Sequence, residues 1–588
     1  KDGRTTFALV YIPSKGGVDP GQPEALAAQA ALKGVTVGGA PVQVTGLNAL
    51  RAMTARDDQG SSPGVLIETL AAGLGALLVL ALVFASAMAV VPLLMAIVAI
   101  PTTFLLIWPV AAITDVSVIV QYLAALIGLG IAIDYALLVV VRWREERHKH
   151  VSNDVAIERT MQHAGSAVVF SGTTVAIAML ALIILPVPVL RSIGIAGILI
   201  PLVSVAVATT LLPVVLATVG PRLDRRHTRR DDRGSRVWSA WARVVVRHRW
   251  VAAITATALL GALLVVASTI QLGDPSADSL AQSGPAHAGV EKLKDSGIGT
   301  GPLSPFETLV RSGNSGAVAK AIDAVDGVAA TVAPSDWRRG GVALIDVIPT
   351  AEGNSAAGRA TLDRVRVASD AVPAEVSTGG EAAQSADFLD AVYGNFPLVI
   401  ALIAGMTFLL LARAFRSLIL PLKAVLLNLL SVAAAWGLMV LVWQKGVGSH
   451  AIWGIDATGS INVEMPVVIF AFLFGVSMDY QVFIISRMRE AYDRTGSTET
   501  AVIEGIGRTG RLVTSAALIM ALAFVAMSAS PGTEVKMFAT ALGGGILLDA
   551  TLIRGVLAPA LVAILGRGNW WLPDRPARML RVEASEAA

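Results

Sequence analysis

The chain has 588 residues, of which 54% are hydrophobic and only 15% are charged. Because a soluble globular protein usually carries about a quarter charged residues, this composition excludes an ordinary soluble fold for the whole chain. The sequence contains no cysteine, which excludes disulfides and thiolate metal sites, and its net charge is only +3.

Two sets of long apolar stretches run along the chain, and each is long enough to cross a bilayer. A membrane-spanning helix needs roughly 20 apolar residues, and membrane helices tolerate the Gly and Pro residues found within these stretches. The pattern therefore predicts a polytopic α-helical membrane protein. The eleven predicted spans are Gly64–Ser86, Met88–Ile113, Val116–Val141, Ala164–Leu185, Ile193–Val219, Val251–Ile270, Phe396–Leu411, Leu418–Trp443, Val467–Ile485, Leu512–Ser530 and Met537–Leu565.

Two other segments have a water-soluble character, Lys1–Pro63 and Gln271–Asn395. Both mix short strand-like runs with Ala-rich helical stretches, which predicts compact α+β domains. The opening run TTFALVYIP is rich in apolar and β-branched residues, as in a strand. In the second segment, Val342–Thr350 is predicted to be a strand and Leu362–Asp370 an amphipathic helix.

Arginine is concentrated in loops that alternate with Arg-poor loops. Pro221–Arg249 carries ten Arg against three Asp, and further Arg residues lie in Arg142–His163, at Arg413 and Arg416, and from Arg487 to Arg511. Because basic loops of membrane proteins stay in the cytoplasm, this alternation predicts that both soluble segments lie outside and the C-terminus inside.

The chain also repeats itself at an offset of 345 residues. The segment GIAIDYALLVVVRWREE (Gly130–Glu146) matches GVSMDYQVFIISRMREA (Gly475–Ala491). Because both halves have the same predicted orientation, this is a parallel repeat. The aligned pairs are Gly130 with Gly475, Asp134 with Asp479, Tyr135 with Tyr480, Arg142 with Arg487, Arg144 with Arg489 and Glu145 with Glu490.

The repeat predicts the domain organisation. In the second half one helix precedes the outside domain and five follow it, whereas no helix precedes it in the first half. We therefore expect an N-terminal helix and part of the first outside domain to be missing from this chain, and twelve helices in the full protein. The predicted division is 1–63 as the remainder of the first extracytoplasmic domain, 64–220 as the membrane helices of the first repeat, 221–249 as an Arg-rich cytoplasmic loop, 250–270 as the first helix of the second repeat, 271–395 as the second extracytoplasmic domain, 396–566 as the remaining membrane helices and 567–588 as a short cytoplasmic tail.

These motifs resemble the resistance-nodulation-division (RND) superfamily and, within it, the MmpL (mycobacterial membrane protein, large) family. The residues that carry the resemblance are GLGIAIDYALLVVVRWREER, FLFGVSMDYQVFIISRMREAY, LLDATLIRGVLAPALVAILG and NWWLP, so it covers essentially the whole chain. It implies an RND fold with two parallel repeats and two α+β porter domains outside the bacterial inner membrane. It also implies a proton-driven exporter of lipids or other amphiphilic molecules, in which two Asp-Tyr pairs form the proton relay.

The residues themselves support a relay at Asp134, Tyr135, Asp479 and Tyr480. A carboxylate inside the membrane costs roughly 2.5–3.5 kcal/mol on insertion scales and marks a functional site by default. Each Tyr points about 100° away from the Asp on its own helix. We therefore predict that the two Asp residues face one another near the midplane and that each Tyr bonds the Asp of the partner helix. The alternative is a buried acid that only forms a packing hydrogen bond.

Other intramembrane polar residues are weaker candidates. Asp549 precedes Arg554 by five residues, which fits either a part in the relay or an ion pair that orients the helix. Ser171, Thr174 and Ser515 lie in two other helices, where they either bond the Asp-Tyr pairs or back-bond to carbonyls of their own helix.

No enzyme, cofactor or metal motif is recognisable. A Walker A motif needs Lys followed by Ser or Thr, and no Lys here has that neighbour. The seven His form no metal-spaced cluster. The Arg-rich loop is better explained by affinity for anionic lipid headgroups than for nucleic acid, and Lys423 is expected to extend its ammonium to the membrane interface.

The competing hypotheses are a multidrug efflux pump of the same superfamily, a Sec-type protein-export accessory and a membrane scaffold that transports nothing. The outside domains are small for a drug pump, and the fused repeat argues against the Sec-type subunit. The expected partners are a lipid or amphiphilic substrate, protons and the bilayer, while the exact substrate and the oligomeric state stay open.

Overall fold

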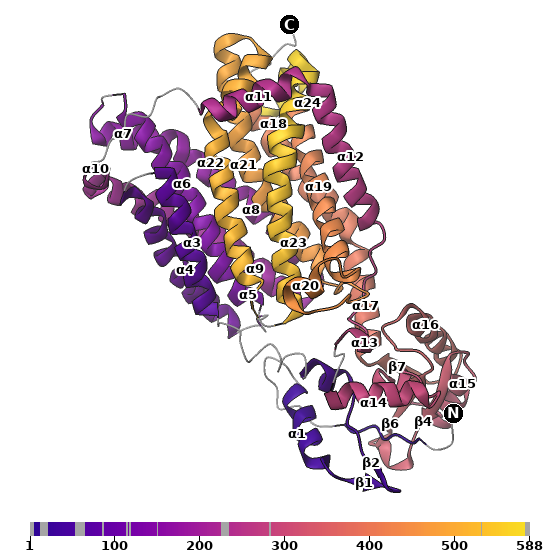
Figure 1. Ribbon diagram of the computed structural model, residues 1–588. Helices are drawn as coiled ribbons and strands as arrows, with labels where there is room; N and C mark the ends of the chain where they lie inside the picture. Colours follow the sequence, from indigo (N-terminus) through magenta and orange to yellow (C-terminus); the bar gives the residue numbers. More distant parts are fainter. Residues whose placement is uncertain are drawn as a thin grey trace. The chain divides into compact units, whose positions relative to one another are not determined.

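The computed structural model divides the chain into two compact units, each built from segments far apart in the sequence (Figure 1). The mixed unit consists of Lys1–Ser62, Ile270–Gly394 and Val440–Val463. The helical unit consists of Pro63–Thr269, Asn395–Met439 and Glu464–Ala588. The structure describes residues 5–11, 21–52, 65–84, 87–112, 116, 119–149, 151–224, 235–280, 284–530 and 532–582.

Helices of four to 31 residues make up the helical unit, as its apolar composition predicts. In the first half of the chain they are α3 (Val65–Phe84), α4 (Val90–Ala111), α5 (Ile119–Tyr122), α6 (Gly128–Arg147), α7 (Asn153–Thr160), α8 (Ser166–Ile184), α9 (Pro188–Thr218), α10 (Gly220–Leu223), α11 (Arg236–Arg247) and α12 (Arg249–Ala267). In the second half they are α18 (Phe396–Phe415), α19 (Ile419–Met439), α21 (Met465–Thr495), α22 (Thr498–Met527), α23 (Thr533–Leu548), α24 (Ala558–Leu565) and α25 (Asp574–Leu580). A π-helical segment, η7 (Asp549–Leu557), joins α23 to α24, and a short 3-10 turn, η8 (Gly566–Trp570), follows α24.

Among the residues that the structure describes, ten helices are long and apolar enough to cross a membrane. They correspond to ten of the eleven predicted spans. The remaining prediction, Gly64–Ser86, coincides with α3, of which Thr69–Leu82 forms a shorter apolar helix. Because the ends of that predicted span lie outside the described residues, its full length stays a prediction.

The helices that carry the Asp-Tyr motifs are the most buried of these spans. In the apolar stretch of the span that contains α6, 89% of the residues are buried. The corresponding share is 88% for α21 and only 22% for α12. Helix α6 packs against α4 and α9, and α21 packs against α8 and α22. A helix that is apolar on all sides belongs in the interior of a bundle. Both motifs therefore lie on interior helices of the helical unit.

The Arg-rich segment 221–249, predicted as a loop, contains the helix α11. The prediction missed the amphipathic character of this helix, which packs against α22. A Cβ atom added at Gly510 of α22 would lie only 2.5 Å from the indole ring of Trp238. The Trp241 indole nitrogen also donates a hydrogen bond to the Gly555 carbonyl at 2.8 Å. Aromatic residues thus fix a helix inside an otherwise basic connection.

The described residues of the mixed unit form a five-stranded antiparallel sheet in the order β4-β6-β3-β7, with β5 also paired to β6. Helices pack against its strands around a core that includes Phe306, Ile345 and Leu362. The strands are β3 (Phe306–Ser312), β4 (Val328–Val332), β5 (Arg338–Arg339), β6 (Val342–Pro349) and β7 (Glu375–Gly379), and the helices α15 (Ser315–Asp323), α16 (Ala356–Asp370) and α17 (Glu381–Tyr393).

The remaining elements of the mixed unit are short. They are α1 (Gln22–Leu32), β1 (Thr36–Val37), β2 (Ala40–Pro41), α13 (Ala277–Leu280), α14 (Gly284–Asp295), η4 (Gly301–Leu303), η5 (Ser335–Trp337), η6 (Val440–Gln444) and α20 (Ser449–Trp453).

Two of the three predicted local elements of this unit are correct. The strand β6 and the helix α16 occupy the positions predicted for them. The opening run was predicted as a strand, but its described residues, 5–11, are not in a strand. Among the described residues no strand pairs with them, and Tyr11 donates a hydrogen bond to Asp346 and packs its ring edge-on against Trp337. An apolar, β-branched composition alone does not supply the paired backbone that a strand needs.

Candidate functional site

The core of the candidate site is a hydrogen bond between the two central helices. The Tyr480 hydroxyl of α21 donates to Oδ2 of Asp134 on α6, and it also lies 3.3 Å from the Met520 sulfur. Asp134 and Tyr480 are each only 6% exposed. The bond joins residues 346 positions apart in the chain, one from each copy of the repeated motif.

The surroundings of Asp134 leave one of its oxygens unsatisfied. Within the described part of the chain, Oδ1 of Asp134 is buried and has no hydrogen-bond partner. Burying a charged group without enough partners is costly. When this carboxyl group gains or loses a proton, its contacts with neighbouring groups therefore have to change.

The second Asp-Tyr combination is described only in part. Tyr135 is 2% exposed on α6, next to Asp134. Asp479 precedes Tyr480 on α21, but its side chain lies outside the described residues. The predicted bond between Tyr135 and Asp479 and the facing of the two carboxyl groups stay predictions.

A buried ion pair adjoins Tyr480. The Arg554 guanidinium is paired with Oδ2 of Asp549 and donates to the Ser477 carbonyl at 2.7 Å. The Ser477 hydroxyl donates to the same Asp549 oxygen at 2.6 Å. The centre of the Arg554 guanidinium lies 4.6 Å from the centroid of the Tyr480 ring, which is a cation–π contact. The ion pair therefore adjoins the tyrosine that bonds Asp134.

The location of this ion pair has a local structural cause. Asp549 and Arg554 both lie in η7, a π-helical stretch within the run from α23 to α24. Such segments are rare and often occur at functional sites. A separation of five residues places two side chains on one face of a π-helix, in which each turn holds one more residue than in an α-helix. Sequence reasoning gave the separation but not the π-helical geometry.

The hydroxyl groups predicted to support the relay have other contacts. Thr174 donates to the carbonyl of Ser171 at 2.7 Å, and Ser515 to that of Arg511 at 2.7 Å. These are the back-bonds that the sequence left open as the alternative. The Ser171 hydroxyl is buried, and it has no hydrogen-bond partner among the residues described. A supporting part of these three residues in the relay stays a prediction.

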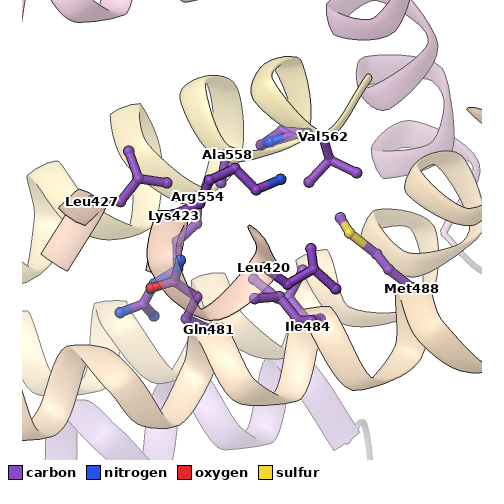
Figure 2. Close-up of a pocket in the computed structure, with 11 residues that line it drawn as sticks. Leu420, Lys423, Leu427, Gln481, Ile484, Met488, Arg554, Ala558 and Val562 are labelled. Carbon is purple, nitrogen blue, oxygen red and sulfur yellow. The ribbon is translucent and has the colours of Figure 1, made fainter. Parts of the chain in front are cut away.

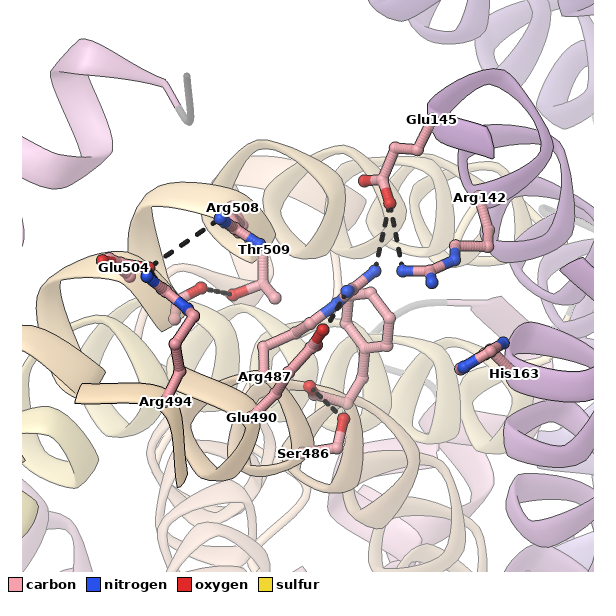
Figure 3. A network of polar contacts seen from close by, with 12 residues as sticks. Arg142, Glu145, His163, Ser486, Arg487, Glu490, Arg494, Glu504, Arg508 and Thr509 are labelled. Atoms are coloured by element: carbon pink, nitrogen blue, oxygen red, sulfur yellow. Dashed lines mark hydrogen bonds and ion pairs between the residues drawn. The ribbon is translucent and has the colours of Figure 1, made fainter. Parts of the chain in front are cut away.

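Sequence reasoning did not predict a second link between α6 and α21, at their Arg-rich ends (Figure 3). The Arg487 guanidinium lies 3.2 Å from Glu145 on α6 and 3.0 Å from Glu490 on its own helix. Arg142 lies 3.4 Å from the same Glu145 oxygen. The repeat aligns Arg142 with Arg487 and Glu145 with Glu490. This alignment places equivalent charged residues at the ends of both helices, and it could have predicted the link between them.

Acidic, phenolic and basic side chains are the functional groups described at this site. Within the described ranges, no three His, Asp or Glu side chains lie close enough together to hold a metal ion. The described groups can bind a proton at a carboxyl, form hydrogen bonds through a phenol and compensate charge through arginine.

This fold is shared with a solved membrane protein. The structure of SecDF from Thermus thermophilus, a translocon-associated membrane protein, aligns with 89% of this chain and 63% of its own chain, at a TM-score of 0.53 and 16% identity. Likeness at that identity concerns the fold alone. Together with the ten apolar helices, it gives the chain the fold of a polytopic membrane protein of the RND type.

Sequence comparison identifies the family. The model of the MMPL family matches residues 1–254 and 307–583. The membrane protein SCO6666 of Streptomyces coelicolor is 34% identical over 98% of this chain and 81% of its own length. The chain belongs to the MMPL family of the RND superfamily.

Two MmpL11 proteins are among the relatives that carry functional names. The mycolic acid-containing lipids exporter MmpL11 of Mycolicibacterium smegmatis is 33% identical over 84% of this chain. The heme uptake protein MmpL11 of Mycobacterium tuberculosis is 33% identical over 86%. The chain spans about half the length of these relatives, 54% in each case.

Proposed function

We propose that this protein uses the proton-motive force to export lipids or other amphiphilic molecules across the bacterial inner membrane. The observation that carries the proposal is the buried hydrogen bond from Tyr480 to Asp134, which joins the two central helices of the bundle. An ionisable residue within a membrane span is rare and marks an ion or substrate pathway.

In the proposed mechanism, Asp134 accepts a proton from one side of the membrane and releases it to the other. Loss of the proton leaves a charge that the buried site has to accommodate. A rearrangement of α6 against α21 provides this accommodation, and Tyr480 takes part because its hydroxyl bonds Asp134 directly. Asp479 and Tyr135 form the equivalent half of the relay.

The available driving force sets the scale of the conformational change. One charge that moves through roughly 100 mV supplies about 2.3 kcal/mol. Since 1.4 kcal/mol corresponds to a tenfold change in an equilibrium, one proton shifts a two-state equilibrium by a few tens of fold. The two arrangements of α6 and α21 therefore have to differ little in free energy.

The substrate class and the direction rest on relatives and on family membership. A relative named as an exporter of mycolic acid-containing lipids supports lipid export. An equally similar relative is named for heme uptake, so inward movement of an amphiphile is the second candidate. In our proposal both soluble segments of the chain lie outside the membrane, and an apolar cavity in them accepts an acyl chain.

Reconstituted protein tests the proposal. The full chain is inserted into liposomes with a fluorescent long-chain lipid, a pH gradient is imposed, and a membrane-impermeant quencher reports the lipid in the outer leaflet. Asp134→Asn should abolish the gradient-driven transfer, while Asp154→Asn, on the exposed face of α7, should retain it. Transfer at the wild-type rate by Asp134→Asn would refute the relay, and a scaffold without transport would show no transfer in any variant.

A further inference from the structure

A small cavity in the helical unit has properties that the proposed relay does not use. Its volume is about 20 Å³, and residues of α19, α21 and the η7–α24 segment line it. Figure 2 shows three polar side chains at this cavity, Lys423, Gln481 and Arg554, among apolar ones such as Leu420, Ile484 and Met488. The polar groups come from three different helical segments.

The positive charge of Lys423 has no described counter-charge. Its ammonium donates to the side-chain oxygen of Asn569, which is an uncharged amide. Within the described part of the chain, no carboxylate lies within ion-pair distance of Lys423. The hydrogen bond ties Lys423 to Asn569, which is fully buried. That Lys423 reaches the membrane interface stays a prediction.

Arg554, the other cation at the cavity, differs in this respect. It forms an ion pair with Asp549, so its charge is already compensated. A buried charge without a partner is strongly unfavourable, whereas a paired one is tolerated. At the cavity, Lys423 is the cation without a described counter-charge, and its side chain is half-buried.

Gln481 supplies an independent observation. The side chain is only 6% exposed, and no described residue forms a hydrogen bond with its amide. Buried side-chain amides are almost always hydrogen-bonded, either to protein or to a bound molecule. The Gln481 amide lines the cavity that Lys423 also lines, so both groups can serve one occupant.

The volume limits what that occupant can be. A cavity needs about 10–15 Å³ on this measure to hold one water molecule, so 20 Å³ accepts a single small particle and no acyl chain. Water would satisfy Gln481, whereas an anion would also supply a counter-charge for the half-buried Lys423. We propose that the cavity binds one small monovalent anion of the size of chloride, held by the Lys423 ammonium and the Gln481 amide. This proposal goes beyond transport and does not depend on the relay.

Bromide tests the proposal, because it resembles chloride and can be located by its anomalous scattering. Crystals of the full chain grown with sodium bromide should show an anomalous peak within hydrogen-bonding distance of Lys423 and Gln481. In detergent, wild-type protein should show a saturable rise in Tm with bromide, against sodium gluconate at equal ionic strength.

Three variants localise the effect. Lys423→Met should lose the anomalous peak and weaken bromide binding at least about tenfold, because it removes a charge-assisted contact. Gln481→Leu leaves the bond between Lys423 and Asn569 in place, so it should fold normally and also weaken binding. Lys320→Met removes an exposed lysine of α15 and should bind bromide as the wild type does.

Two results would overturn the proposal. One is a cavity that holds only water, or nothing, in bromide-containing crystals. The other is a bromide-dependent rise in Tm that is equal in the wild type, Lys423→Met and Gln481→Leu, which would place the binding elsewhere. Because binding is measured without substrate or a proton gradient, failure of the relay would leave this test unaffected.

Discussion

Tyr480 donates a hydrogen bond to Asp134 across the interface of the two repeats, although the two residues are 346 positions apart. The bond follows from the parallel repeat. An axis along the membrane normal brings equivalent residues to the same depth, so the Tyr of one motif comes level with the Asp of the other.

Removal of that hydroxyl should impair transport without unfolding the protein. A hydrogen bond to a charged group contributes about 1.5–3 kcal/mol, so we expect Tyr480→Phe to lower the transport rate about ten- to a hundredfold. Tyr492→Phe is the matched control, because Tyr492 lies on the same helix and stacks on Trp570 through its ring. Equal transport by the two variants would contradict a role for the Tyr480 hydroxyl.

The ionic link at the Arg-rich ends of α6 and α21 should be measurable by a double-mutant cycle. Glu145 is 41% exposed and Arg487 is 12% exposed, so solvent weakens their interaction. We expect Glu145→Gln and Arg487→Gln to show a coupling energy of about 0.2–1 kcal/mol in unfolding experiments. Strictly additive effects would show that the two side chains do not stabilise the helix pair.

Close packing of α11 on α22 predicts a penalty at Gly510. An added Cβ would lie 2.5 Å from the Trp238 ring, and overpacking of this kind costs about 1–3 kcal/mol. Gly510→Ala should therefore lower the Tm of the purified protein. Gly405→Ala on α18 places its Cβ where no atom lies within 4 Å and should not lower it. A Tm for Gly510→Ala at or above the wild-type value would contradict the described packing.

The mixed unit should be more stable in acid than at neutral pH. Burial raises the pKa of Asp346 on β6, although the hydrogen bond from Tyr11 opposes this. Burial and the charge of Asp346 also raise the pKa of Glu307, its cross-strand partner on β3. A carboxyl with a raised pKa in the folded state favours folding below its unfolded pKa of about 4. This stabilisation is lost as the pH rises through the folded-state pKa.

Hydrogen exchange of the full chain measures this effect. After correction for the intrinsic pH dependence, amides of β6 should be more protected at low than at neutral pH. Asp346→Asn should shrink the difference, and Glu307 and Asp274, whose pKa values burial also raises, should account for what remains. An unchanged pH dependence in Asp346→Asn would exclude Asp346 as its source.

The sequence was most informative where a pattern repeats or is long. The apolar stretches predicted the membrane helices, and the alignment of Asp134 with Asp479 and of Tyr135 with Tyr480 led to the expected contact between motifs. The contact between Tyr480 and Asp134 depends only on equal depth and on facing helices, and both follow from the symmetry of the repeat.

The remaining contacts depend on geometry that the residue types do not specify. The cation–π contact of Arg554 with Tyr480 needs the π-helical turn at Asp549. Ser515 was a candidate partner of the relay, but its own helix offers a carbonyl at 2.7 Å. The bond between Lys423 and Asn569 joins residues 146 positions apart, and no repeat or motif pairs them.

The most direct test of the central claim is the movement of protons themselves. Wild type, Asp134→Asn and Asp154→Asn are reconstituted in liposomes that contain a pH-sensitive dye, and a gradient of a lipid substrate is imposed. We predict substrate-dependent proton flux with the wild type and Asp154→Asn, and none with Asp134→Asn although it is folded and inserted. Proton flux of wild-type size through Asp134→Asn would contradict the assignment of Asp134 as the residue that carries the proton.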